Sequence, residues 1–299
     1  IYSGGLGLLS GDHLKASSDA DIPLIGVGLL YQKGYHQQFL NPDGWQTERY
    51  PINDFYTLPV RPVSQNGTDE LKFTVQLPGR TLYVKVWHID VGRVKLYLLD
   101  TNIPENTRPE DRDITDSLYG GDIHTRMQQE IVLGIGGMRA LKQLGFQPTV
   151  FHMNEGHSAF LAIERIRLLI KDHHLNFDEA LDATRHNNVF TTHTSVPAGI
   201  DLFDPGMMFE YFHEYCADTG ISFDQLLTLG RLIVPPMIAF FGWLPGKLAG
   251  PTVRLAADNA RRNPQRVAAT TAALTIGLTL MTAFTSVISS AQATSNERI

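Results

Sequence analysis

Three short motifs in the sequence carry groups that could do chemistry. The first is Ser3-Gly4-Gly5-Leu6-Gly7, which runs into the helical pattern LLSGDHLKASSD. A glycine turn that opens a helix exposes several backbone N–H groups with no Cβ atom in the way, and such groups bind anions such as phosphate. The same residues also suit a tight turn in which backbone packs against backbone. Spacing alone leaves both interpretations open.

The second motif is HMNEGH at residues 152–157, at the end of the apolar strand pattern TVFHM. Ligands of parallel α/β sheets gather beyond the carboxyl ends of the strands, so Glu155 and His157 are candidate binding residues. A metal site is disfavoured, because the spacing is not HExxH and no further Cys, His or Asp cluster completes a ligand set. The structural alternative is that Asn154 caps a helix that begins at Gly156, with Glu155 in its first turn.

The third motif is TTHTSVPAG at residues 191–199, again directly after an apolar strand pattern. Pro197 and Gly199 force a loop, so His193 is expected where a strand gives way to an exposed turn. A hydrogen-bonded structural histidine fits this spacing as well as a catalytic or ligand-binding one. His193 is therefore a third candidate.

Two further features are interpreted as structural. Gly134, Gly136 and Gly137 interrupt a helical pattern, where glycine costs stability relative to alanine, so we expect them to permit close packing. Asp122 and Arg126 are spaced to form a solvated ion pair at the start of the same helix.

Hydrophobic periodicity predicts the strands and helices that carry these motifs. Residues 72–100 alternate as strands do, with turn residues at Pro78-Gly79 and Gly92, which predicts an antiparallel meander. From residue 126 to 144 the apolar spacing is helical, and it stops at Gly145.

The following segment predicts a parallel sheet. A strand at TVFHM, helices at about 157–174 and 178–186, and a strand at NVFTTHT imply a right-handed crossover connection. The fold class expected for residues 1–230 is therefore α/β.

The composition of the chain limits the classes of binding partner and the compartment that we expect. A net charge of −6 over 299 residues argues against nucleic acid or an anionic membrane as the main partner. The single cysteine, Cys216, excludes an internal disulfide and fits a reducing compartment. The chain opens on IYSGGLG without an initiator Met or a signal-peptide pattern, which we interpret as the interior of a longer protein.

The pattern changes near residue 231. Residues 267–291 run for 25 residues without a charge, which is long enough to span a bilayer. Basic residues precede this run, so the sequence predicts a transmembrane helix at 267–291 with a basic interfacial helix at about 247–266 on the cytoplasmic side. Residues 232–244 are too short to cross alone and predict a partial span. The alternative is an Ala/Thr-rich helix buried in a soluble core.

Taken together, the three motifs support a family resemblance. IYSGGLGLLSGDHLKASSD, HMNEGHSAF and VFTTHTSVPAG occur in one order, with GVGLLYQKGYHQQ, DITDSLYGGD and RMQQEIVLGIGG between them. This sequence resembles the α-glucan (glycogen, starch or maltodextrin) phosphorylase family over essentially all of residues 1–230. The resemblance implies a glycosyltransferase that moves glucose from the end of an α-1,4-glucan to phosphate, giving glucose 1-phosphate.

The resemblance also implies a fold and a cofactor. Such an enzyme has two Rossmann-like lobes of the GT-B type with the active site in the cleft between them, and residues 1–230 would be a fragment of the N-terminal lobe. The family uses pyridoxal phosphate for its phosphate group. The lysine that holds the cofactor, and the basic residues that hold substrate phosphate, lie in the other lobe and are not expected in this chain. We therefore expect the chain to be inactive alone.

The family resemblance also implies roles for individual residues of this chain. Gly4 and Gly5 would offer backbone N–H groups to the cofactor and substrate phosphates. Glu155, which stands where many relatives have Asp, and His157 would line the glucosyl site. His193 would contact the glucose and stabilise charge near its anomeric carbon, and Asp122 would belong to a mobile loop that gates the cleft.

Two departures from the family bear on these expectations. Ser195 stands where the family more usually has Pro, which relaxes the loop that carries His193. Residues 231–299 instead resemble the inner part of an FtsX/MacB-type ABC-transporter permease, as if pieces of two proteins were joined near residue 231. The resemblances imply a cytoplasmic location for 1–230 and a membrane anchor through 267–291. The alternatives are a permease fragment and a non-catalytic glucan-binding module.

Overall fold

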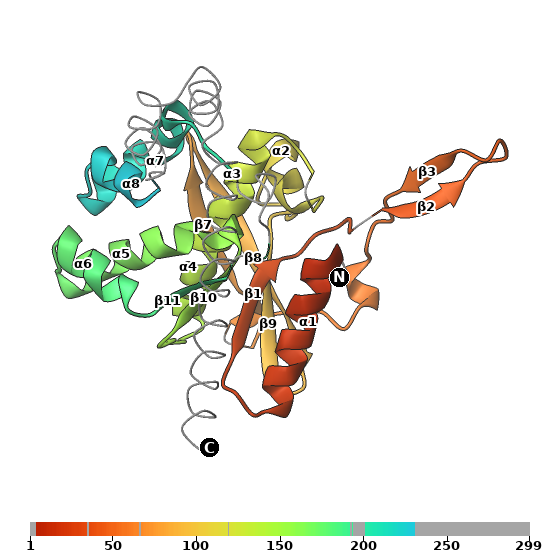
Figure 1. Cartoon of the computed structure of the whole chain (residues 1–299), viewed down its shortest axis with the longest axis horizontal. Helices are drawn as coiled ribbons and strands as arrows, with labels where there is room; N and C mark the ends of the chain where they lie inside the picture. The colour runs from red at the N-terminus through yellow and green to blue at the C-terminus, as the bar shows by residue number, and fades with distance from the viewer. Residues whose placement is uncertain are drawn as a thin grey trace, which may run out of the picture. The chain divides into compact units, whose positions relative to one another are not determined.

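The computed structural model describes residues 4–34, 36–65, 67–118, 120–191, 193 and 201–230 (Figure 1). The chain divides into two compact units, Ile1–Thr192 with Asp201–Leu226, and His193–Ile200 with Leu227–Ile299, which are treated separately. The helices are α1 Gly4–Asp19, α2 Pro109–Arg112, α3 Ile123–Ile131, α4 Gly137–Gln143, α5 Phe160–His173, α6 Phe177–Arg185, α7 Pro205–Thr219 and α8 Phe223–Leu229. The strands are β1 Ile25–Leu29, β2 Gln37–Leu40, β3 Gln46–Arg49, β4 Arg61–Pro62, β5 Ser64–Gln65, β6 Asp69–Glu70, β7 Lys72–Leu77, β8 Arg80–Val91, β9 Val94–Asp100, β10 Phe151–Asn154 and β11 Asn188–Thr191.

The larger sheet contains the predicted antiparallel meander. Its strands run in the order β1-β9-β8-β4, and β7 also pairs with β8. Strands β7, β8 and β9 are consecutive and antiparallel. The turns between them contain Gly79 and Gly92, whose φ angles of 66° and 61° lie in the left-handed region that glycine adopts without steric cost. The predicted turns are therefore confirmed.

A parallel strand that the sequence analysis did not anticipate extends this sheet. β1 pairs with β9 in parallel, from Ile25 opposite Lys95 to Leu29 opposite Leu99. Two of its five residues are glycines, which weaken the strand signal. Glycine is needed at position 26 because the neighbouring side chains are close. A Cβ there would lie 2.8 Å from Leu96 Cδ1 and 3.1 Å from Leu14 Cδ2 of α1.

The predicted strand–helix–strand segment is confirmed as a second, parallel pair. β10 and β11 pair from Phe151 opposite Asn188 to Asn154 opposite Thr191, and helices α5 and α6 connect them. Both helices begin and end close to the predicted positions. The capping box between Asn176 and Glu179 fixes the start of α6.

The long helix predicted over residues 126–144 is interrupted. α3 passes at Ile131 into a π-helical stretch, η3 (Val132–Gly136), before α4 continues to Gln143. A Cβ on Gly134 would lie 2.7 Å from the backbone N of Leu161 in α5, so the expectation of close packing at these glycines is confirmed. The expectation of a continuous α-helix is wrong, because π-type bonding widens the helix where it meets α5.

A buried carboxylate joins three helices. Glu164 of α5 is fully buried and accepts hydrogen bonds from Arg139 Nε of α4 (3.1 Å), Arg167 Nη2 (2.7 Å) and the Tyr215 hydroxyl of α7 (2.7 Å). Arg139 also donates to the backbone carbonyl of Thr74 in β7 at 2.8 Å. The network therefore holds α4, α5 and α7 together and fastens α4 to the sheet.

The structural alternative for Asn154 and the predicted ion pair of Asp122 are both wrong. Asn154 does not cap a helix, because it is the last residue of β10 and its amide donates to Ser10 Oγ of α1 at 3.1 Å. Asp122 does not pair with Arg126, because its carboxylate caps α3 by accepting the backbone N–H of Thr125 at 2.9 Å. Within the described residues, no helix is both long enough and apolar enough to cross a membrane. The predicted partial span, interfacial helix and transmembrane helix (232–244, 247–266 and 267–291) lie outside the described residues.

Candidate active site

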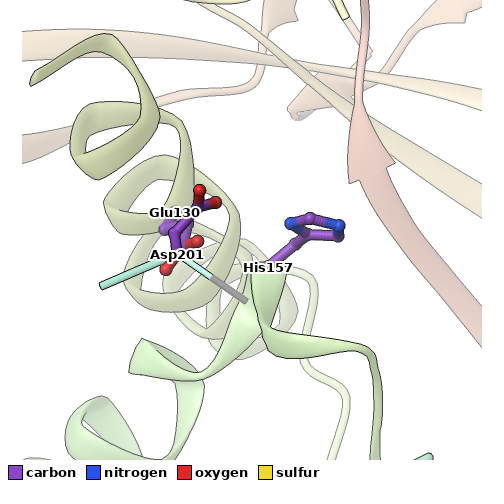
Figure 2. A group of neighbouring side chains, drawn as sticks. All are labelled: Glu130, His157 and Asp201. Carbon is purple, nitrogen blue, oxygen red and sulfur yellow. The ribbon is translucent and has the colours of Figure 1, made fainter. Parts of the chain in front are cut away.

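Side chains from three segments converge beside the carboxyl end of β10. Helix α3 supplies Arg126 and Glu130, the turn η4 (Gly156–Ser158) after β10 supplies His157, and the segment before α7 supplies Asp201. Figure 2 shows the carboxylates of Glu130 and Asp201 close together, with the His157 ring beside them. The sequence analysis named His157 as a site residue and missed the other three roles.

The Arg126 guanidinium joins the members of this group. Its Nη2 lies 2.7 Å from Asp201 Oδ2 and 3.2 Å from His157 Nδ1, and its Nε lies 3.2 Å from the same Asp201 oxygen. A guanidinium can only donate, so His157 Nδ1 must accept. The ring is therefore neutral, with its proton on Nε2.

The electrostatics agree with a neutral His157. Burial lowers the pKa of His157, and the nearby Arg126 charge lowers it further. In the same cluster, burial raises the pKa of Glu130 to about 8, and the charge and hydrogen bond of Asp201 act in the same direction. Glu130 is thus a protonated acid at neutral pH and can donate to Asp201.

The cluster has the residue types of a metal site but is better described as a hydrogen-bonded network. Ligand atoms of Glu130, His157 and Asp201 lie within 4.8 Å of one another. However, Arg126 already brings a positive charge against both His157 and Asp201, and the protonated Glu130 is a poor ligand. A cation would have to displace the Arg126 guanidinium and deprotonate Glu130.

Glu155 has a strained backbone. Its φ of 64° and ψ of −174° lie in a region that is essentially reserved for glycine, and its side chain is 2% exposed. Its N–H donates to the carbonyl of Thr191 in β11 at 2.9 Å, which fixes the start of the turn. Strain of this kind persists where the surroundings require it and is common at functional sites, so Glu155 keeps its place as a site candidate.

Gly4, Gly5 and Asp122 are not part of this network. Gly4 and Gly5 open α1, whose first turn contains no acidic residue, and a Cβ at Gly5 would meet no atom within 4 Å. Asp122 is exposed, and its hydrogen bonds from Thr125 lower its pKa. His193 is exposed and belongs to the second unit.

A cavity of about 500 Å³ extends away from the network. Arg126, Glu130 and His157 line one end of it, and apolar residues of α1 and of the sheet line most of the rest. The polar network therefore lies at one end of a concave, largely apolar space.

These features define an α/β domain with a polar site at the end of a parallel strand, and sequence comparison identifies similar proteins. The chain is 48% identical over 241 residues to a glycogen phosphorylase from Mycobacterium tuberculosis (strain CDC 1551 / Oshkosh), a match that covers 77% of this chain and 28% of the relative. It is 46% identical over 231 residues to a maltodextrin phosphorylase from Thermococcus litoralis, covering 77% of this chain and 27% of the relative. A glycogen phosphorylase from Aquifex aeolicus is 40% identical over 230 residues, with 77% and 33% covered.

The chain therefore spans about a third or less of the length of these relatives. A search of protein-family models finds no match. The similarity agrees with the resemblance of residues 1–230 to phosphorylases, and none of these three matches supports a permease-like segment.

Proposed function

We propose that residues 1–230 form part of the Rossmann-like, GT-B-type N-terminal lobe of an α-glucan phosphorylase, with α-1,4-glucan and phosphate as substrates. The proposal is supported by the 48% identity to a glycogen phosphorylase together with the geometry around His157. Glu155 and His157, which the family resemblance assigns to the glucosyl site, flank the carboxyl end of β10, where ligands of parallel sheets bind.

The chemistry of the cluster suits a neutral polyhydroxyl ligand. In this proposal His157 is held neutral by Arg126 and presents its Nε2–H as a donor to a sugar hydroxyl. The protonated Glu130 reduces the negative charge that the buried cluster would otherwise carry. The strained Glu155 carries a charge that acts on His157, so its carboxyl group lies near the same site at a cost in stability.

The start of α1 fits a phosphate group. A helix of 16 residues that begins with Gly4 and Gly5, with no acidic residue in its first turn, offers backbone N–H groups to an anion. These residues would contact the phosphates of pyridoxal phosphate and substrate. The cofactor would supply a phosphate group that exchanges a proton with the substrate phosphate.

The roles of His193 and Asp122 belong to the same proposal. His193 would stabilise charge at the anomeric carbon, and Asp122, exposed at the start of α3, would lie in the loop that gates the cleft. A cytoplasmic location is part of the same proposal. No observation within the described residues favours the permease alternative.

A chimera tests the proposal. The segment of the M. tuberculosis glycogen phosphorylase that matches this chain would be replaced by residues 1–230, which are similar enough to preserve the internal packing. We expect the chimera to release glucose 1-phosphate from maltodextrin and phosphate. A chimera that folds and binds pyridoxal phosphate but releases none would contradict the proposal.

The isolated chain tests the expectation of inactivity. Purified 299-residue protein, incubated with maltodextrin, phosphate and pyridoxal phosphate, should release no glucose 1-phosphate, because proximity and preorganised charge from both walls of the cleft supply most of the rate. Robust release would show that the chain is catalytically complete.

A further inference from the structure

Strand β1 has an open edge. It is the terminal strand of the order β1-β9-β8-β4, and within the described residues no strand pairs with its other side. The N–H of Leu30 donates to the carbonyl of Leu99 at 2.8 Å, which fixes the direction of the backbone groups. Because alternate residues of a parallel strand bond to opposite neighbours, the N–H groups of Val27 and Leu29 point away from β9.

The two faces of β1 are covered by helical elements. On one face Gly26 lies against Leu14 of α1. On the opposite face the side chain of Val27 lies against α4, since a Cβ on Gly137 would be 3.2 Å from Val27 Cγ1. β1 is therefore built like an internal strand of a parallel sheet, with helices on both faces, but among the described residues it has a neighbouring strand on one side only.

The cavity of about 500 Å³ reaches this open edge and also extends over β9 and β8, where Leu96, Leu98, Ile89 and Val91 line it. Three consecutive residues of β1, Val27, Gly28 and Leu29, line it, although neighbouring residues of a strand point to opposite faces. A cavity that touches all three must follow the edge of the strand. Leu14 of α1 and Leu133 of η3 also line it, so the helical layers continue beyond β1 on both sides.

We propose that this slot accepts one further β-strand, parallel to β1 and apolar on both faces, supplied by a polypeptide segment that is not part of these 299 residues. The backbone donors of Val27 and Leu29 would extend the hydrogen-bond ladder, and the two helical layers would bury both faces of the new strand. The parallel direction follows from β1 and β9, and the β10–β11 pair is parallel as well.

The relatives show that such polypeptide exists in proteins of this kind, because the match covers only 28% of the M. tuberculosis enzyme. The existence of the slot does not depend on the proposed function. Only the inference that the added strand comes from a phosphorylase rests on that function. His157 lines the same cavity, so the added strand would close the wall of the candidate active site below this residue.

Amide hydrogen exchange of the 299-residue chain tests the slot. The probe is the peptide acetyl-KVVYVVK-amide, which is apolar on both faces and carries lysines for solubility. At ten times its Kd, the peptide should slow exchange at Val27 and Leu29 by about tenfold. Gly26 and Gly28, whose N–H groups point to β9, serve as internal controls and should exchange slowly with or without the peptide.

The matched control is the same peptide N-methylated at its five central residues, which keeps the side chains and removes the backbone donors. It should give no protection, whereas equal protection by both peptides, or by neither, would contradict strand addition. Slow exchange at Val27 and Leu29 in the free, dilute chain would show that the chain fills its own slot and would overturn the proposal. Protection that rises with chain concentration would make a second copy the occupant and would also overturn it.

A variant supplies a second readout. Val27→Pro removes one outward N–H without touching the bonds to β9, so the chain should keep slow exchange at Gly28. Its affinity for the unmethylated peptide should fall about tenfold, the effect of one lost hydrogen bond. Unchanged affinity in the folded variant would contradict the assignment of the open edge.

Discussion

Arg126 and Asp201 lie 75 residues apart in the sequence and form an ion pair with 2.7 Å between Nη2 and Oδ2. The pair fastens the segment before α7 to helix α3. Because Arg126 also donates to His157, the contact fixes the tautomer of a candidate binding residue as well as the path of the chain.

The charge of Arg126 should be measurable at His157. Arg126→Gln removes a positive charge that lowers the pKa of His157, so the pKa of His157 should rise in the variant. NMR titration of the histidine ring resonances in parent and variant measures the change. Arg108→Gln, at an exposed site, should leave the pKa of His157 unchanged. A variant of Arg126 with no rise would show that the guanidinium does not act on the ring.

Glu130 should make the chain less stable as pH rises. Its pKa is about 8 in the folded protein and near 4.5 when unfolded, so the folded state binds the proton more tightly and stability is lost as pH rises from about 4.5 to 8. The slope from this group is at most about 1.4 kcal/mol per pH unit.

Glu130→Gln keeps a donor to Asp201 and removes this titration. Urea unfolding at pH 5.5 and pH 9 should find the variant more stable than the parent at the higher pH, with a smaller difference at the lower one. The same difference at both values would mean that Glu130 titrates normally in the folded chain.

The Glu164 network should matter for stability more than any surface pair. Glu164→Ala leaves two arginines and a buried tyrosine hydroxyl without their shared acceptor, and the free energy of unfolding should fall by about 3 kcal/mol. Asp172→Ala, which breaks the exposed pair with Lys142, should cost less than about 1 kcal/mol. Equal losses in the two variants would contradict a structural role for the buried network.

The glycines of α1 and η3 should respond in opposite ways to alanine. Gly134→Ala brings a Cβ against the backbone of α5 and should destabilise the chain by about 1–3 kcal/mol. Gly11→Ala, in open space within α1, should stabilise it by about 0.5–1 kcal/mol. Thermal melts of the two variants compare the effects, and a neutral Gly134→Ala would mean that η3 and α5 separate easily.

The sequence allowed prediction of the elements whose signals are local. The meander followed from alternation and from turns at Gly79 and Gly92, and β10 and β11 followed from apolar runs. β1 was missed because its glycines serve close packing against Leu96 and Leu14, which only the tertiary structure reveals. Its apolar residues on both faces were the available signal.

The site was predictable only in part. His157 could be named from its place after a strand, but its partners come from elsewhere in the chain. Glu130 lies on the apolar face of α3, three residues after the buried Met127, and an acid on such a face was the signal that could have found it. Asp201 gave no comparable signal, and the misassigned partners of Asp122 and Asn154 show that local spacing does not decide between competing hydrogen bonds.

The most direct measurement is kcat/KM for maltodextrin phosphorolysis by the phosphorylase chimera that carries residues 1–230, compared with its His157→Ala variant. We predict an active chimera and a loss of about hundredfold or more in the variant, with the same pyridoxal phosphate content and Tm. His13→Ala, at an exposed histidine of α1, should stay near the chimera's rate. An active chimera whose rate is unchanged by His157→Ala would contradict the central claim that this residue forms part of the glucosyl site.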